Sequence, residues 1–461
     1  MTDCKSCGMN YDPNEFDFCP YCGYVPEDEA EGAGEKAHGE VQQAGQSKDP
    51  EKTVQTADKQ TEPGAAEQAK PAGSKVKYIV TALAAVAVIA AALFVAPSLN
   101  GSAVTVPDRY DTIQEAIDAA EDGDEIVIDI GTYRENIDFN GKNITLRSID
   151  PDDRNVVDQT IIDGGNSGSV VSFRSGEDEG AVLSGLTVTR GSGILISGGS
   201  SPVIEKCIVE DNTAEFGAGI AIFDSSPTIL NNTIIGNSGF LGGGLFIEES
   251  SPHVEGNTIA RNRAEMGSGM VIISNSSPTI IGNRIAENVA ERLGGGIVVA
   301  VNSSPTIQGN EVIGNIAERN GGGILIEESE PIIEDNTFAR NRAANGAGLF
   351  IVNSFNTTLR IIGNRITANV ASIAGGGLYM EGSSPVIEDN SFIDNISEHL
   401  GGGAAVYNSS PLFSLNTFEN NDAQGVEGGG AIWASEDSTL DLSDPDDNNY
   451  LQNTPDDLVL E

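Results

Sequence analysis

The chain has 461 residues, of which 55 are glycine and one is tryptophan, and its formal net charge is −44 at pH 7. This length calls for an elongated core or several domains, and so much glycine indicates repeated turns rather than a compact enzyme domain. The negative charge excludes a nucleic-acid-binding protein, because contacts with a phosphate backbone need a basic surface.

Two Cys-x-x-Cys pairs open the chain, Cys4 with Cys7 and Cys19 with Cys22, and a glycine follows each pair. Four thiolates at this spacing suit one tetrahedral zinc ion, and disulfides or a redox pair are the alternative. Residues 1–25 resemble the zinc-ribbon family, which implies structural zinc. Since four thiolates leave no open position on the metal, we expect a structural role and contact with a cytosolic protein partner.

A polar segment and an apolar segment follow the cysteines. Residues 26–77 are rich in Glu, Gln, Ala, Lys, Gly and Pro, which predicts a disordered linker. Residues 78–96 carry no charge and are long enough to span a bilayer, although a buried core helix would share this composition. Lysines precede the apolar segment, so we predict a single-pass protein of the cell (inner) membrane with a cytoplasmic N-terminus and a periplasmic or extracellular remainder.

The next segment predicts a short helix followed by strands. Thr112 and Glu115 form a capping-box pattern ahead of an apolar helical face, which predicts a helix within residues 111–123. Strands are expected over residues 125–130 and 143–147. The stretch TIQEAIDAAEDGDEIVIDIGTYRENI resembles the opening of right-handed parallel β-helix proteins, the group that contains pectate lyases, pectin esterases and NosD-like periplasmic proteins. The resemblance implies that the helix covers the first turn of a β-helix.

The rest of the chain is a repeat. Its anchors recur every 25–28 residues, at Pro202, Pro227, Pro252, Pro278, Pro305, Pro331, Leu359, Pro385 and Pro411. Three short strands per unit predict an all-β, right-handed parallel β-helix with three strands per turn and about 12 turns over residues 104–435.

Asparagine stands ten residues after every anchor. Such residues tolerate left-handed corners, and their amides can bond from turn to turn, so we expect a structural ladder of Asn237, Asn262, Asn288, Asn315, Asn341, Asn369, Asn395 and Asn421. A second asparagine stands five residues after each anchor except the first, where Cys207 is expected to be a small buried substitute.

Two further features bear on ligands. Residues 436–461 are acidic and lack Lys and Arg, which indicates an acidic C-terminal cap or tail, with calcium as a second candidate cofactor. Alternation also places an apolar stripe on the outer side of one sheet, at Phe246, Val271, Val298, Leu325, Phe350 and Tyr379. The stripe is either a wall covered by loops or a docking surface for a polysaccharide or a cell-surface protein.

No catalytic residue can be assigned. The resemblance suggests a polysaccharide lyase, which would need a basic residue facing an acidic cluster. The candidates are Arg261, Arg284, Arg340 and Arg365, with Glu255, Glu334 and Glu388 nearby. These residues alternate like solvated surface positions, and no turn stands out. We therefore expect a membrane-anchored cell-envelope binding or adhesion module without catalysis, with a polysaccharide lyase as the alternative and a passive spacer favoured if the stripe is buried.

Overall fold

The computed structural model describes residues 2–3, 10–11, 104–355, 358–425, 428–442 and 448–460. The chain divides into two units, Met1–Phe94 and Val95–Glu461. In the first unit the description is limited to the antiparallel strands β1 (Thr2–Asp3) and β2 (Asn10–Tyr11). The four paired cysteines and residues 78–96 lie outside the described residues. No helix among the described residues has the length and apolar character to cross a bilayer.

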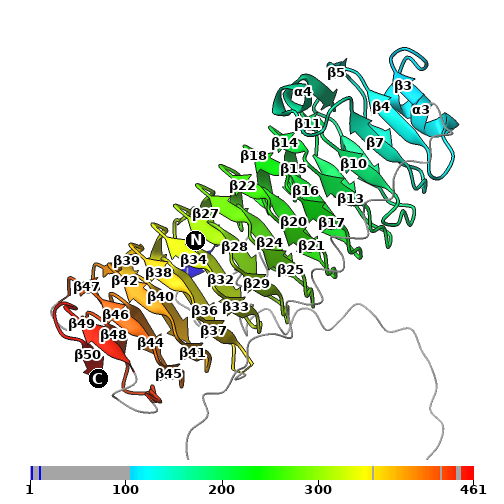
Figure 1. Ribbon diagram of the computed structural model, residues 1–461. Helices are drawn as coiled ribbons and strands as arrows, with labels where there is room; N and C mark the ends of the chain where they lie inside the picture. Colours follow the sequence, from blue (N-terminus) through cyan, green and yellow to red (C-terminus); the bar gives the residue numbers. More distant parts are fainter. Residues whose placement is uncertain are drawn as a thin grey trace, which may run out of the picture. The chain divides into compact units, whose positions relative to one another are not determined.

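The second unit is a parallel β-solenoid of about 13 turns (Figure 1). Three sheets of 13 strands run along it, and every strand except the two at the ends of each sheet pairs with its counterparts in the turns before and after. We call them sheets I, II and III, in the order in which the chain visits them within a turn. The sequence-based prediction of an all-β parallel β-helix is confirmed.

Sheet I comprises β3 (Val104–Val106), β4 (Glu125–Ile128), β7 (Thr145–Ser148), β10 (Val182–Ser184), β13 (Val203–Glu205), β17 (Thr228–Leu230), β21 (His253–Glu255), β25 (Thr279–Ile281), β29 (Thr306–Gln308), β33 (Ile332–Glu334), β37 (Arg360–Ile362), β41 (Val386–Glu388) and β45 (Leu412–Ser414). Sheet II comprises β5 (Gly131–Tyr133), β8 (Thr160–Asp163), β11 (Thr187–Thr189), β14 (Ile208–Glu210), β18 (Thr233–Ile235), β22 (Thr258–Ala260), β26 (Arg284–Ala286), β30 (Glu311–Ile313), β34 (Thr337–Ala339), β38 (Arg365–Thr367), β42 (Ser391–Ile393), β46 (Thr417–Glu419) and β49 (Asn449–Leu451). Sheet III comprises β6 (Ile137–Asp138), β9 (Val171–Phe173), β12 (Ile194–Ile196), β16 (Ile220–Phe223), β20 (Leu245–Glu248), β24 (Met270–Ile273), β28 (Ile297–Val299), β32 (Ile324–Glu327), β36 (Leu349–Val352), β40 (Leu378–Glu381), β44 (Ala404–Tyr407), β48 (Ile432–Ala434) and β50 (Leu458–Leu460).

A fourth sheet corrects the prediction of three strands per turn. Sheet IV has nine strands and lies in the chain between sheets II and III. It comprises β15 (Thr213–Phe216), β19 (Ser238–Leu241), β23 (Arg263–Met266), β27 (Val289–Leu293), β31 (Ile316–Ala317), β35 (Arg342–Asn345), β39 (Val370–Ala374), β43 (Ile396–Ser397) and β47 (Asp422–Ala423). The fourth strand is thus absent before residue 213 and after β47. Between these points the link from sheet II to sheet III is long enough to pair with the equivalent link in neighbouring turns.

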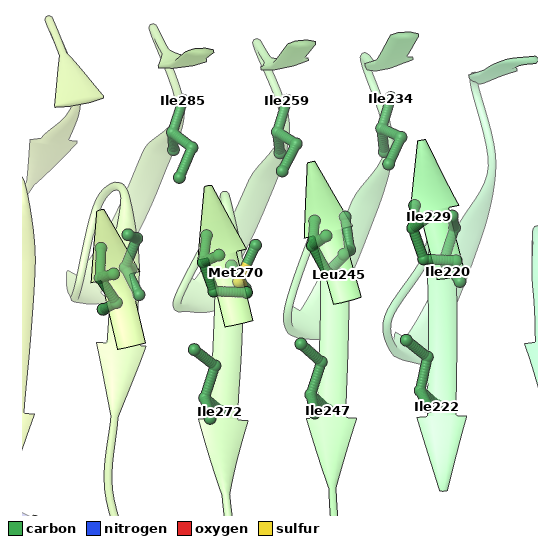
Figure 2. Packing of buried hydrophobic residues seen from close by; sticks show 14 of the residues in the cluster. Ile220, Ile222, Ile229, Ile234, Leu245, Ile247, Ile259, Met270, Ile272 and Ile285 are labelled. Carbon is green, nitrogen blue, oxygen red and sulfur yellow. The ribbon is translucent and has the colours of Figure 1, made fainter. Parts of the chain in front are cut away.

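The interior is aliphatic. Figure 2 shows Ile234, Ile259 and Ile285 stacked in one column and Ile222, Ile247 and Ile272 in another, each column built from equivalent positions of successive turns. All six side chains have no exposed surface. One inward residue per strand of sheets I and II and two per strand of sheet III therefore supply the core, as the alternation of a β-strand requires.

The corners are held by side-chain ladders. Asn288 donates from its backbone N–H and from Nδ2 to Asn315 Oδ1, both at 3.0 Å, and Nδ2 also reaches the Ile259 carbonyl at 3.0 Å. The same pattern runs through Asn237, Asn262, Asn315, Asn341, Asn369, Asn395 and Asn421. A second column begins at Asn232, whose Oδ1 accepts the backbone N–H of Cys207 at 2.9 Å. Because the buried amides are paired, the corners carry no polar penalty.

A helix covers the first turn. Helix α3 (Ile113–Ala119) is shorter than the predicted range, and Thr112 Oγ1 accepts the N–H of Glu115 at 3.1 Å, as the capping pattern predicts. The carboxylate of Glu135 accepts the N–H groups of Ile113 and Gln114, so this distant residue completes the cap. Ile113 and Ile117 are fully buried against the core.

Two further elements frame the solenoid. Helix α4 (Arg154–Gln159), which the sequence pattern did not predict, lies on sheet II, where Thr187 Oγ1 donates to the Val157 carbonyl at 2.8 Å. At the other end, the acidic segment after residue 435 contributes β49 and β50, which pair with β46 and β48. The solenoid therefore extends to Leu460.

Candidate functional site

The metal sites expected from sequence cannot be placed. Cys4, Cys7, Cys19 and Cys22 lie outside the described residues, as do Asp444, Asp446 and Asp447 of the acidic tail. Within the described part of the chain, no group of three or more His, Cys, Asp or Glu side chains could hold a metal ion. Cys207 is buried and free, and burial raises the pKa of its thiol to about 12.

The ladder asparagines do not reach a ligand. Each is at most 1% exposed, and their amide groups are used between turns. Their role is to join turns, since a buried, fully bonded amide has nothing left to offer a substrate.

The apolar stripe lies on the outer side of sheet III but is covered. Phe246, Val271, Val298, Leu325 and Phe350 are between 2% and 6% exposed, and Tyr379 is half-buried. They form a cluster of their own outside the main core, together with Leu241 and Leu293 of sheet IV. Sheet IV and the glycine turn that follows it fold back over sheet III: the rings of Phe216 and Phe246 are 5.3 Å apart, and a Cβ atom on Gly267 would come within 2.2 Å of Val271 Cγ2.

Burial changes what the stripe can do. Five of its six members offer a ligand almost no surface, and Tyr379 stacks on Phe350 at 5.0 Å while its hydroxyl donates to Glu381. Burial, and then the charge of Glu381, raise the pKa of Tyr379. The stripe is therefore a second hydrophobic core, and the interpretation of a covered wall accounts for it. By the stripe alone a passive spacer would be favoured, so a binding function depends on another surface.

The lyase candidates lie on different sheets. Arg284 and Arg365 begin strands of sheet II, and Arg261 and Arg340 lie in the turns after it, whereas Glu255, Glu334 and Glu388 end strands of sheet I. Among the described residues, no ion pair joins the two groups, and Arg284 instead pairs with Glu311 at 2.8 Å. The structure thus leaves these side chains without the convergence that proton abstraction needs.

A hollow opens on sheet III before sheet IV begins. It has a volume of about 360 Å³ and is lined by Asn136, Ile137, Asp138, Ser167, Gly168, Ser169, Ser172, Arg174 and Leu195. Asp138, Ser172 and Leu195 occupy the outward column that Phe246 and Val271 continue in later turns. The hollow thus lies on a part of this outer face that no strand of sheet IV covers.

Polar groups inside the hollow are held in place by the first turn. Arg174 Nε pairs with Asp138 Oδ2 at 2.5 Å, and Asp138 Oδ1 accepts the N–H of Asn140 at 2.8 Å. The side chain of Gln114 on α3 bonds both the N–H and the carbonyl of Asp138. Asn136 Nδ2 donates to the carbonyls of Ser167 and Ser169. The Oδ1 atom of Asn136 takes no part in these two hydrogen bonds.

The carboxylates in and beside the hollow are all engaged. Asp138 is the one carboxylate among the lining residues, and its charge is balanced by Arg174. The nearby carboxylate of Glu135 caps α3, and that of Glu177 is buried and bonded to Ser200 Oγ and to the N–H groups of Ser175 and Gly141. Burial alone would raise the pKa of Glu177, but these hydrogen bonds outweigh it and lower the pKa below its usual value. A pair of free carboxyl groups for acid and base catalysis is missing from the lining.

Sequence reasoning missed Asn136, Asp138 and Arg174, although a signal was present. Only four residues separate the end of β11 at Thr189 from the start of β12 at Ile194, whereas nine separate Ile235 from Leu245 in the next turn but one. The short link predicts a turn without the fourth strand, and hence an uncovered outer face.

Comparisons with known proteins agree with the fold. The model of the right handed beta helix region matches residues 135–285 and 242–378, together more than half of the chain. The chain therefore belongs to the right-handed β-helix family. No curated protein matches it. Among solved structures, the catalytic domain of a GH87 α-1,3-glucanase in complex with nigerose aligns over 78% of this chain and 70% of its own, at 12% identity and a TM-score of 0.24, a likeness too small to bear on function.

Proposed function

We propose that this protein is a non-catalytic binding module of the cell envelope and that the hollow beside α3 is its ligand site, with carbohydrate as the ligand class. The lining combines an amide oxygen, serine hydroxyls, an Arg–Asp pair and one apolar side chain, Leu195. Such groups suit a sugar, which presents hydroxyls around its ring and C–H groups on its faces. The Nη groups of Arg174, whose side chain is 61% exposed, remain available as donors.

One observation carries the proposal that the module binds without catalysis. A glycosidase needs two carboxyl groups on either side of the bond it cleaves, and the lining supplies one, already paired with Arg174. A lyase needs a base opposite an acidic cluster, and the arginine and glutamate candidates lie on different sheets.

The membrane and zinc segments complete the proposal. Residues 78–96 would anchor the chain, and the four thiolates of Cys4, Cys7, Cys19 and Cys22 would hold structural zinc at a surface for a cytosolic partner. The full-length chain should then contain one zinc per molecule by elemental analysis. Replacing Cys4 and Cys7 by serine should remove the zinc and leave the solenoid's circular dichroism unchanged.

The experiment is a glycan array with the full-length chain in detergent, followed by incubation with each bound polymer. We expect binding that Arg174→Ala and Asn136→Ala each weaken about tenfold, because each removes hydrogen bonds that the free site cannot replace. Arg154→Ala, on the exposed surface of α4, is the matched control. Cleavage of a bound polymer, seen as new reducing ends or unsaturated products, would establish the alternative function of a carbohydrate-active enzyme.

A further inference from the structure

In the half of the solenoid that follows Lys206, the lysines and arginines are confined to a few turns. Beyond Lys206, every basic residue is an arginine that lies between residues 261 and 365. Acidic residues such as Glu265, Glu287 and Glu291 lie in the same turns, so positive charge gathers only where arginines are neighbours.

Four of these arginines form two doublets on one edge. Arg261 and Arg263 flank the ladder residue Asn262, and Arg340 and Arg342 flank Asn341, at the edge where sheet II passes to sheet IV. All four side chains are exposed, and within the described residues none of them makes an ion pair or a side-chain hydrogen bond. Register pairs Arg263 through Val289 and Ile316 with Arg342, so the doublets are three turns apart, about 14 Å.

Two glutamate doublets lie on another edge at the same spacing. Glu248 with Glu249, and Glu327 with Glu328, stand where sheet III passes to sheet I, at the ends of β20 and β32. These strands are also three turns apart in sheet III, again about 14 Å. None of the four carboxylates is in an ion pair within the described residues. Burial, and then the neighbouring charge of Glu328, raise the pKa of Glu327, so this carboxylate lacks a cation in the single chain.

We propose that the arginine edge of one copy binds the glutamate edge of a second copy, with the two solenoids side by side and their axes aligned. Both spacings are set by the same turn height, so when one arginine doublet meets a glutamate doublet the other pair also meets. The match is equal for parallel and antiparallel copies. Bidentate contacts between guanidinium and carboxylate groups would neutralise all four doublets.

The geometry also predicts the form of the assembly. Because the two edges differ, the contact is heterologous. However many copies are added, the assembly keeps one free arginine edge and one free glutamate edge. The assembly should therefore grow as a ribbon instead of closing as a dimer. Charged contacts of this kind weaken when salt shortens the screening length to about 3 Å at 1 M.

The test is sedimentation velocity of the full-length chain in detergent, over a range of concentrations. The wild type should form dimers and larger species in 0.1 M salt and sediment as a single species in 1 M salt. Arg261→Glu with Arg340→Glu, or Glu249→Arg with Glu328→Arg, should each raise the dissociation constant about tenfold or more. A 1:1 mixture of these two variants should recover association, because the two reversed edges complement each other again.

Controls separate this proposal from others. Arg109→Glu with Arg134→Glu makes the same change in net charge at exposed positions outside both edges and should leave association unchanged. A wild type that stays a single species at 0.1 M salt, or a mixture that fails to recover association, would overturn the proposal. Tight binding of heparin that Arg261→Glu with Arg340→Glu abolishes, without self-association, would assign the arginine edge to a foreign polyanion instead. Glycan capture by Arg174 is independent of each of these outcomes.

Discussion

The turns before residue 213 and the turns after it use the same sheet differently. In the later turns, sheet IV lies over the outer face of sheet III, and Phe246 and Val271 form a second core there. In the early turns the fourth strand is absent, and the corresponding positions, Asp138 and Leu195, border an open hollow. One added strand per turn therefore decides whether the outer wall of this solenoid stabilises the protein or faces a ligand.

The corner between sheets III and I differs in the same way. In the later turns it is held by a column of serines, in which Ser276 donates its backbone N–H to Ser303 Oγ at 3.2 Å and Ser303 donates in turn to Ser329 at 3.1 Å. In the early turns the buried carboxylate of Glu177 replaces the column and accepts from Ser200 Oγ at 2.6 Å. The regular turns repeat a weak hydrogen bond between neutral groups many times, whereas the irregular turns depend on a stronger hydrogen bond to a charged carboxylate.

The largest effect should come from breaking a ladder in the later turns. Asn315→Leu leaves the buried Asn288 N–H without its acceptor, and it removes the Nδ2 donor that Asn315 supplies to the Ile285 carbonyl and to Asn341 Oδ1. The free energy of unfolding should fall by about 4 kcal/mol or more. Urea unfolding followed by circular dichroism measures it. Asn155→Leu, at an exposed site on α4, is the control and should cost less than about 0.5 kcal/mol. Equal losses would show that the ladder does not stabilise the later turns.

The covering by sheet IV can be tested on two positions of one column. Phe246→Ala should lower the free energy of unfolding by about 3–5 kcal/mol, because a ring that is 2% exposed leaves a cavity. Leu195→Ala, at the half-buried position beside the hollow, should cost about 1 kcal/mol. Similar losses in urea unfolding would contradict the difference between covered and uncovered turns.

A pH series should isolate the early turns. The pKa of Glu177 is lowered in the folded chain, so its contribution is present above the unfolded value near pH 4.5 and is lost as the pH falls through the folded value. Glu177→Gln should therefore cost about 2 kcal/mol at pH 7 and progressively less below pH 4.5. Thermal unfolding between pH 3 and 7 measures this convergence. A constant difference across the series would mean that the charge of Glu177 has no role.

The smallest effect concerns Cys207, which lies where the two regions meet. With a pKa of about 12, the buried thiol should resist alkylation by iodoacetamide at pH 8 in the native chain, because almost none of it is thiolate. Mass spectrometry of its peptide along a urea series should show labelling when this boundary opens. Labelling without urea would show that the boundary opens in the native state.

What the sequence predicted follows from repetition. Each turn gives Ile229, Ile280 or Asn288 nearly the same surroundings as its equivalents, so the period, the inward columns and the positions of the asparagines could be predicted without knowing the three-dimensional neighbours. The cap on α3 was likewise readable from Thr112, a contact three residues apart.

What the sequence missed depends on contacts between distant segments. The strand Ser238–Leu241 has the composition of a loop, and only pairing with equivalent strands makes it part of a sheet. The burial of Phe246 depends on this strand, and the hollow at Asp138 depends on its absence. Alternation predicted which residues face outward, but it cannot tell what lies over them.

The asparagine columns also govern how the length of this protein can change. Asn315 accepts from Asn288 and donates to Asn341, so every turn presents the same bonding groups to the turn on either side. Loss or duplication of one whole repeat of 25–28 residues would leave each asparagine amide hydrogen-bonded, whereas deleting part of a repeat would leave several amides without a partner. Evolution can thus lengthen or shorten this rod only in steps of about 4.8 Å, one gene segment at a time.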